Sequence, residues 1–212
     1  MTKKERARQI GEVFDTVYPN AKCSLDYKTE HQLLVATMLS AQCTDARVNL
    51  VTPALFKRYK SVDEFASADI CEVEEYIRSC GFYHNKAKNI ILSARQILER
   101  HGGKVPDSME ELVSLAGVGR KTANLILGDV FGKPSVVVDT HCIRITNRLG
   151  LSEGKDPEKI EMQLKKILSP ETSGRFCHQI VYHGREICTA RNPKCADCPV
   201  KHLCKTGIKE QI

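Results

Sequence analysis

The chain has 212 residues, and its 32 Lys and Arg against 26 Asp and Glu give a formal net charge of +6. At about 100–200 residues per domain, this length predicts one or two domains. A hydrophobic content of 42% with 27% charged residues excludes a disordered or low-complexity chain. No apolar run approaches the roughly 18 residues of a membrane span. The charged N-terminus also lacks the apolar core of a secretory signal, so we expect a cytoplasmic protein with no membrane partner.

Nearly every segment has the pattern of a helix, so the predicted fold class is all-α. Capping boxes, in which Ser or Thr is followed three residues later by Glu or Gln, predict helix starts after Thr29, Ser61 and Ser108. The apolar run 33–39 has no polar face, which predicts a buried helix. Thr52-Pro53 fits either a helix interrupted by Pro53 or the start of a new helix.

Helical spacing continues through the second half of the chain. The clearest amphipathic stripe runs from 87 to 98 and ends at Gly102, and further helices are expected from Asp156-Pro157 onward and over about 172–188. Only the three valines at 136–138 resemble a strand, and three residues do not make a sheet.

A tight hairpin is predicted where a short helix over 108–116 meets a longer one that begins near Arg120. Gly117 and Gly119 in the turn allow backbone N–H groups to approach an anion closely. The following helix N-terminus adds positive potential. Because Arg120 and Lys121 come directly after the turn, the pattern favours an anion site, such as one for a DNA phosphate, over an ordinary helix–helix turn.

Lys121 and Asp139 each have two interpretations. Positive potential at a helix N-terminus beside Arg120 disfavours a protonated amine, and a neutral lysine is a nucleophile that forms Schiff bases; the alternative is a solvated or phosphate-contacting lysine. A helix of about 18 Å followed by a return of up to roughly 23 Å allows Asp139 to lie beside Lys121. By itself, Asp139 instead suits the N-cap of a helix ending at Leu149.

The C-terminal tail holds four of the ten cysteines, Cys188, Cys195, Cys198 and Cys204, in a C-x6-C-x2-C-x5-C pattern. Without an export signal we expect metal binding or buried thiols rather than disulfides. So short a loop cannot bury a core, and a metal would supply the missing cross-links. Structural zinc sites usually show two close pairs, whereas iron–sulfur clusters tolerate uneven spacing. The spacing therefore favours a cluster over zinc.

The loop between the first two of these cysteines is basic. Arg191 and Lys194 suit either a solvated surface or, if the hairpin binds DNA, a second phosphate contact. The other cysteines have no ligand-like spacing and are expected to be small, mostly buried side chains: Cys23, Cys43, Cys71, Cys80, Cys142 and Cys177.

Taken in order, these motifs resemble the endonuclease III family of DNA glycosylases over nearly the whole chain. The matching segments are 39–42 (LSAQ), 115–123 (LAGVGRKTA), 138–141 (VDTH), 183–184 (HG) and the four-cysteine tail. The sequence departs from the family pattern at Ala116, where Pro is common, at Phe82, where a Leu wedge is common, and at Cys43, where Ala is usual.

The resemblance implies a helix-hairpin-helix DNA glycosylase fold, with two helical domains flanking a DNA-binding groove. Residues 23–134 would form a six-helix domain that contains the hairpin. Residues 1–22 and 135–212 would form a discontinuous domain that carries a [4Fe-4S] cluster on Cys188, Cys195, Cys198 and Cys204. The implied partner is double-stranded DNA with damaged bases or abasic sites, bound by a monomer at the nucleoid of a bacterial cytoplasm.

The resemblance also implies site residues. Lys121 would be the nucleophile and Asp139 the catalytic aspartate. Gln42 would fill the space left by an extruded nucleotide, with Phe82 beside it. Without the resemblance, Gln42 would be interpreted as a helix terminus and Phe82 as a core aromatic. The expected DNA contacts are Gln42, Phe82, Gly117, Gly119, Arg120, Arg191 and Lys194.

The implied function is that of a bifunctional DNA glycosylase and abasic-site lyase of base excision repair. The target base is flipped out of the stack, and Lys121 attacks C1′ while Asp139 activates the amine and stabilises developing charge. The Schiff base then permits β-elimination, which cuts the strand 3′ to the lesion. The expected substrates are oxidised pyrimidines such as thymine glycol, plus abasic sites.

Three alternatives remain at this stage. A mismatch-specific adenine glycosylase shares the fold and cluster, but that family lacks the lysine nucleophile and carries a further C-terminal domain. A non-enzymatic helix-hairpin-helix DNA-binding module with a structural zinc is a second alternative. An electron carrier is a third, although it would leave the lysine-bearing hairpin without a purpose.

Overall fold

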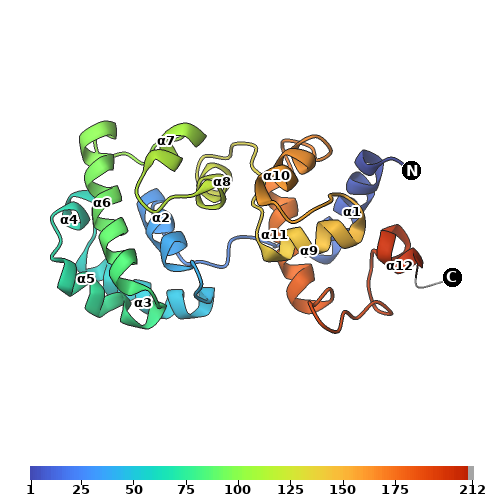
Figure 1. Ribbon diagram of the computed structural model, residues 1–212, viewed down its shortest axis with the longest axis horizontal. Helices are drawn as coiled ribbons and strands as arrows, with labels where there is room; N and C mark the ends of the chain where they lie inside the picture. The colour runs from blue at the N-terminus through green and yellow to red at the C-terminus, as the bar shows by residue number, and fades with distance from the viewer. Residues whose placement is uncertain (210–212) are drawn as a thin grey trace. The chain divides into compact units, whose positions relative to one another are not determined.

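The computed structural model describes residues 1–209, which form α-helices, short 3-10 turns and connecting loops without any strand (Figure 1). The all-α prediction is therefore confirmed. The chain divides into two compact units, one made of Met1–Lys22 with the chain from Gly132 onward and the other of Cys23–Phe131. The second boundary lies at Phe131 rather than at the expected residue 134. No helix among the described residues is long and apolar enough to cross a membrane.

The Cys23–Phe131 unit contains seven α-helices, where the family resemblance implies six. Residues 62–77 form two helices because Asp69 caps a new one: its side chain accepts a hydrogen bond from Glu72 N at 3.1 Å. The helices are α2 (Glu30–Leu39), α3 (Asp45–Arg58), α4 (Val62–Ala66), α5 (Ile70–Ile77), α6 (Tyr83–His101), α7 (Met109–Ser114) and α8 (Arg120–Asp129), with the 3-10 turn η1 (Arg78–Cys80) before α6.

The three capping boxes begin helices as predicted. The hydroxyls of Thr29, Ser61 and Ser108 each accept a hydrogen bond from the backbone N–H three residues later, at 3.2 Å. Each hydroxyl thereby satisfies one of the donors that a helix start leaves unpaired. Pro53 lies inside α3, which decides for the single helix.

Helix α2 is the buried centre of this unit. All residues from Leu33 to Leu39 are buried, as the run without a polar face predicts. The helix packs against α3, α6 and α8 (Figure 1). Because the loop after α2, the start of α6 and the start of α8 carry Gln42, Phe82 and Lys121, one buried helix supports all three candidate segments.

The other unit joins both ends of the chain. It contains α1 (Lys3–Val17), α9 (Thr140–Leu149), α10 (Pro157–Lys165), α11 (Ser173–Glu186), the 3-10 turn η2 (Lys201–Leu203) and α12 (Lys205–Lys209). Its core includes Phe14 of α1 and Phe176 of α11, whose ring centroids lie 6.0 Å apart. Val136 and Val138 belong to the same core although they lie in a segment without regular secondary structure, so the three valines make no strand.

Gly184 allows α9 and α11 to pack closely. A Cβ atom at this position would lie 2.5 Å from His141 Nδ1 and 2.6 Å from Ile145 Cδ1, which is closer than real contacts allow. Glycine in a helix interior costs about 1 kcal/mol relative to alanine. Close packing against α9 explains the glycine at position 184. The same packing fixes the position of α9, the helix that begins after Asp139.

Candidate functional site

The turn between α7 and α8 requires glycine at its first glycine position for two reasons, backbone conformation and lack of space. Gly117 has φ +74°, a conformation that other residues rarely adopt, and a Cβ there would lie 2.8 Å from Asn89 Cβ and 2.9 Å from Met38 Cε. Gly119 is the N-cap of α8, and no side chain caps this helix start. The first N–H groups of α8 therefore have the arrangement that binds anions at helix N-termini.

The Ala116 departure supports the hairpin in a different way. The Ala116 N–H donates a hydrogen bond to Gln96 Oε1 at 2.7 Å, which ties the turn to α6. A proline has no N–H and makes no such bond.

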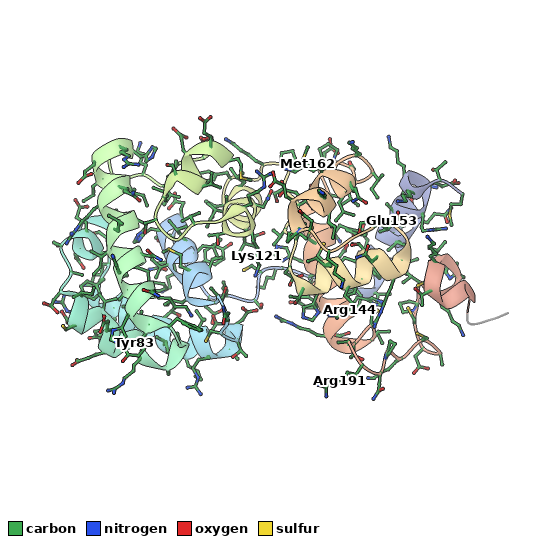
Figure 2. The ribbon with its side chains drawn as sticks, in the orientation of Figure 1. Tyr83, Lys121, Arg144, Glu153, Met162 and Arg191 are labelled. Carbon is green, nitrogen blue, oxygen red and sulfur yellow. The ribbon has the colours of Figure 1, made fainter. Side chains whose placement is uncertain are left out.

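Lys121 is the second residue of α8, and its side chain is exposed (Figure 2). The helix behind it is anchored because the five residues from Ala123 to Leu127 are buried. The amine therefore projects from a rigid element rather than from a mobile loop, which is how a nucleophile is held in position.

Gln42 and Phe82 share an unusual backbone conformation. They are the positive-φ residues other than glycine among residues 1–209, with φ of +55° and +48°. Such conformations cost of order 1–3 kcal/mol each and gather at functional sites. Phe82 is 65% exposed, so its interpretation as a core aromatic is wrong. Both residues line one hollow of about 180 Å³ together with Gly117 of the hairpin.

Lys86, which belongs to none of the sequence motifs, lines the same hollow. Only 7% of Lys86 is exposed, and its Nζ donates to Leu39 O at 2.8 Å and to Cys80 O at 2.7 Å. Burial lowers its pKa. These bonds join the end of α2 to the end of η1, just before Gln42 and Phe82. The available signal was the position of a lysine on the buried face of α6, at helical spacing from Ile90 and Ala94.

Asp139 is the N-cap of α9, as its local pattern predicts. Its Oδ1 accepts a hydrogen bond from Cys142 N at 2.7 Å, and the residue is half-buried. A carboxylate has further acceptor positions, so the cap does not exhaust its chemistry. Asp139 and Lys121 fall in different units, and their expected proximity stays a prediction.

The four tail cysteines line one cavity of about 140 Å³. Burial raises the pKa of Cys198, and the charges of Cys204, Cys188 and Cys195 raise it further. Four thiolates this close require a compensating positive group. The shared cavity is the observation that supports a cluster held by these four residues.

Hydrogen-bond donors surround the same sulfur atoms. Arg148 Nη1 donates to Cys188 Sγ at 3.3 Å, and Gly207 N donates to Cys204 Sγ at 3.4 Å. His183, which is buried against Tyr18, has its Nε2 3.7 Å from Cys198 Sγ. Donors of this kind stabilise ligating sulfur and tune a cluster.

Two arginines of α9, also missed from the sequence, hold the basic loop. Arg144 Nη2 donates to Cys188 O at 3.0 Å, and Arg148 donates to Thr189 O at 2.7 Å and to Ala190 O at 3.0 Å. Arg191 is exposed on this loop (Figure 2). Lys194 of the same loop is exposed as well. The loop is thus tied to the helix that Asp139 caps.

A cavity of a different character lies outside the candidate site. It measures about 680 Å³ and lies along α1, α11 and residues 166–172. None of the predicted site residues lines it. The candidate site is therefore distinguished by its chemistry and not by cavity size.

Comparison with known proteins decides the family. Residues 35–170 match the model described as "HhH-GPD superfamily base excision DNA repair protein", and residues 188–204 match "Iron-sulfur binding domain of endonuclease III". The chain is 52% identical over 207 residues to endonuclease III of Synechocystis sp., covering 97% of this chain and 94% of that protein. The chain belongs to the endonuclease III family. A Bacillus subtilis endonuclease III is 42% identical, with coverage of 95% and 90%.

The fold of this endonuclease III family member agrees with a solved relative. A structure described as a trapped endonuclease III–DNA covalent intermediate matches with a TM-score of 0.92 at 38% identity, over 100% of both chains. The helix-hairpin-helix glycosylase fold is confirmed. The protein is a DNA N-glycosylase and abasic-site lyase, and its cofactor is a [4Fe-4S] cluster. These findings decide against the zinc-bearing binding module and the electron carrier.

The cavity that the four tail cysteines line predicts how the loss of one cysteine affects iron content and stability. We expect Cys188→Ser to lower the iron content and the melting temperature of the endonuclease III family member, because the metal replaces a core that the tail cannot form. Iron analysis, visible absorbance and thermal unfolding measure this. Cys71→Ser is the control, since Cys71 is exposed in the other unit. Full iron content with unchanged melting in Cys188→Ser would contradict the ligand role.

Proposed function

We propose that Lys121 and Asp139 perform the excision of oxidised pyrimidines from double-stranded DNA. The protein is a bifunctional glycosylase and abasic-site lyase for such lesions. The observation that carries the residue assignment is the hairpin: it places an exposed lysine one residue inside a helix start that no side chain caps. That arrangement attracts a phosphate and presents an amine beside it.

Phosphate binding at the hairpin sets the register of the DNA. The first backbone N–H groups of α8, after Gly119, bind a phosphate without reading sequence, and Arg120 adds positive charge. The backbone of the turn is already ordered in the free protein, because Gly117 packs closely against Asn89 and Met38. Little conformational entropy is therefore lost when a phosphate binds. This preorganisation favours binding.

Gln42 and Phe82 serve to hold the opened duplex. An enzyme that acts on a base takes it out of the stack and loses stacking energy of a few kcal/mol. An exposed aromatic ring and an exposed amide beside one hollow offer stacking and hydrogen bonds in its place. Their left-handed conformations project both side chains before DNA arrives, which supports this role over that of core residues.

The chemistry follows from the two side chains. The unprotonated Lys121 Nζ forms a bond to C1′ of the flipped nucleotide while the bond from C1′ to the base breaks, and the base leaves with the bonding electrons. Asp139 accepts the proton of the amine and stabilises the positive charge on the sugar. The C1′–O4′ bond of the resulting aminal then breaks and O4′ takes up a proton, which leaves a Schiff base between Lys121 and C1′. This Schiff base makes the 2′ proton acidic, so loss of that proton and β-elimination expel the 3′ phosphate.

The proposal extends to the setting of the reaction. The solved relatives include endonuclease III bound to DNA, by their descriptions. We expect this chain to bind damaged double-stranded DNA as a monomer at the nucleoid of a bacterial cytoplasm. Its net charge of +6 is consistent with a polyanionic partner.

A panel of duplexes tests the function. Each duplex carries one defined site: thymine glycol, an abasic site, an adenine mismatch or no lesion. We expect base release and strand cleavage with thymine glycol, strand cleavage with the abasic site, and neither with undamaged DNA. Excision of only mismatched adenine would instead favour the mismatch-specific alternative.

Phe82→Ala should weaken binding to the lesion duplex more than to the undamaged one.

The basic loop predicts a change in salt dependence. Replacing Arg191 and Lys194 with Ala should weaken DNA affinity and reduce the slope of log affinity against log salt by about one per lost phosphate contact. Binding titrations at several salt concentrations measure the slope. The matched control replaces Lys155 and Lys159, two exposed residues of the same unit, and removes the same charge. Equal slopes in the two double variants would contradict a DNA contact by the loop.

A further inference from the structure

Two free thiols flank the segments that carry Gln42 and Phe82. Cys43 directly follows Gln42, and Cys80 lies two residues before Phe82. Cys43 is half-buried, whereas Cys80 is only 1% exposed. Neither cysteine belongs to the four that line the cluster cavity.

The two segments are held next to each other by Lys86. Its Nζ bonds to Leu39 O and Cys80 O, at 2.8 and 2.7 Å, bring the chain before Cys43 beside Cys80 itself. The thiols interact directly: after burial, the charge of Cys43 and a hydrogen bond with Cys43 raise the pKa of Cys80 to about 11. The nearby charges of Lys86 and Arg47 lower that pKa and favour the Cys80 thiolate.

We propose that Cys43 and Cys80 form a reversible disulfide that locks the Gln42 segment to the Phe82 segment and makes insertion into DNA sensitive to disulfide oxidants. This inference rests on the proposed function of Gln42 and Phe82. Transient disulfides of this kind occur in proteins whose other thiols stay reduced.

The oxidant is a small-molecule disulfide such as oxidised glutathione. Cys43 is the more accessible thiol, so its thiolate attacks one sulfur of the oxidant, forms a mixed disulfide and releases one small thiol. The Cys80 thiolate then attacks the Cys43 sulfur and releases the second small thiol. The two protein thiols lose two protons and two electrons, and the oxidant is reduced to two thiols.

The new bond changes the site through geometry. A disulfide joins two sulfur atoms and fixes the spacing of the segments that carry them. Gln42 directly precedes Cys43 and Phe82 follows Cys80 by two residues, and both line the hollow of about 180 Å³. The disulfide therefore restricts how far these two side chains can adjust as the duplex opens. We expect oxidation to lower the affinity for a lesion duplex by about fivefold or more, within the range of common coupling effects. Because coupling is reciprocal, bound DNA should slow formation of the disulfide.

Mass spectrometry of the cluster-containing protein tests the bond itself. The protein is treated with oxidised glutathione, free thiols are alkylated, and peptides are mapped without reduction. The expected product is a peptide pair joined through Cys43 and Cys80, which disappears after dithiothreitol. The map separates this pair from Cys142 and Cys177, a second pair of interacting thiols that are both buried. Absence of the Cys43–Cys80 pair at full oxidation of accessible thiols would overturn the proposal.

Binding assays test the consequence. Affinity for a duplex with a stable abasic-site analogue is measured before oxidation, after oxidation and after dithiothreitol, with iron content followed throughout. Wild type should lose affinity and regain it, whereas Cys43→Ala should be unaffected by the oxidant. Cys80→Ala should behave like Cys43→Ala, and the exposed-thiol control Cys71→Ser like wild type.

The outcomes separate this inference from the proposed function. An equal loss of affinity in Cys43→Ala and wild type, at constant iron, would overturn the regulatory role. A linked Cys43–Cys80 peptide with unchanged affinity would do the same. Failure of the proposed function appears differently, as lesion binding by the reduced protein that Phe82→Ala does not weaken.

Discussion

Lys121→Gln should release no base from a thymine glycol duplex and should form no covalent complex with it in the presence of borohydride. Wild type should be trapped, because borohydride reduces the Schiff base between Lys121 and the sugar. Loss of a nucleophile removes the covalent route, so we expect a fall in rate on the order of 10⁴-fold or more. DNA binding should stay largely intact, because the backbone donors of the hairpin are unchanged.

The matched variant for this experiment is Lys121→Arg. It keeps the positive charge for phosphate binding but forms no Schiff base, so it should bind DNA like wild type and yet not be trapped. Gel analysis after borohydride treatment reads trapping, and binding titration reads affinity. A Lys121→Gln protein that is still trapped would assign the nucleophile to another amine.

Asp139→Asn should slow base release by about 10²–10⁴-fold. An amide neither accepts the proton of Lys121 nor balances the positive charge that develops on the sugar. Affinity for DNA should be equal or higher, because one negative charge is removed near a polyanion. Single-turnover kinetics at saturating enzyme measure the chemical step apart from binding.

The observed capping bond makes a second variant informative. Asn caps helices about as well as Asp, whereas Ala costs about 1 kcal/mol. Asp139→Asn should therefore melt like wild type, and Asp139→Ala should melt about 2–4 °C lower. If Asp139 only caps α9, then Asp139→Asn keeps near-normal activity and Asp139→Ala alone is impaired. Full activity in Asp139→Asn would thus reduce this residue to its structural role.

Much of the site depends on signals that are local in the chain. A capping hydroxyl and its N–H partner are three residues apart, so the starts of α2, α4 and α7 are visible in the sequence. The glycines of the hairpin and the spacing of the four cysteines are equally local. The all-apolar run of α2 likewise predicts burial without knowledge of its neighbours.

Other features require contacts between segments far apart in the chain. Lys86 donates hydrogen bonds to two carbonyls, one of them 47 residues away in the chain. Arg148 donates to a loop about 40 residues further along. A lysine or arginine in a helix is normally solvated. Nothing in the local pattern states that these carbonyls lie within reach.

The exposure of Phe82 is another feature that the local sequence does not predict. An aromatic residue before an amphipathic helix suggests a core position, yet Phe82 is 65% exposed. It has a left-handed backbone, between Gly81 at the end of η1 and the start of α6. Local sequence thus suffices for the helices, their caps, the hairpin and the ligand spacing, since these depend on near neighbours. The tertiary structure alone decides the exposed pair Gln42 and Phe82, the buried clamp of Lys86 and the meeting of Cys43 with Cys80, because burial and contact depend on what packs against each segment.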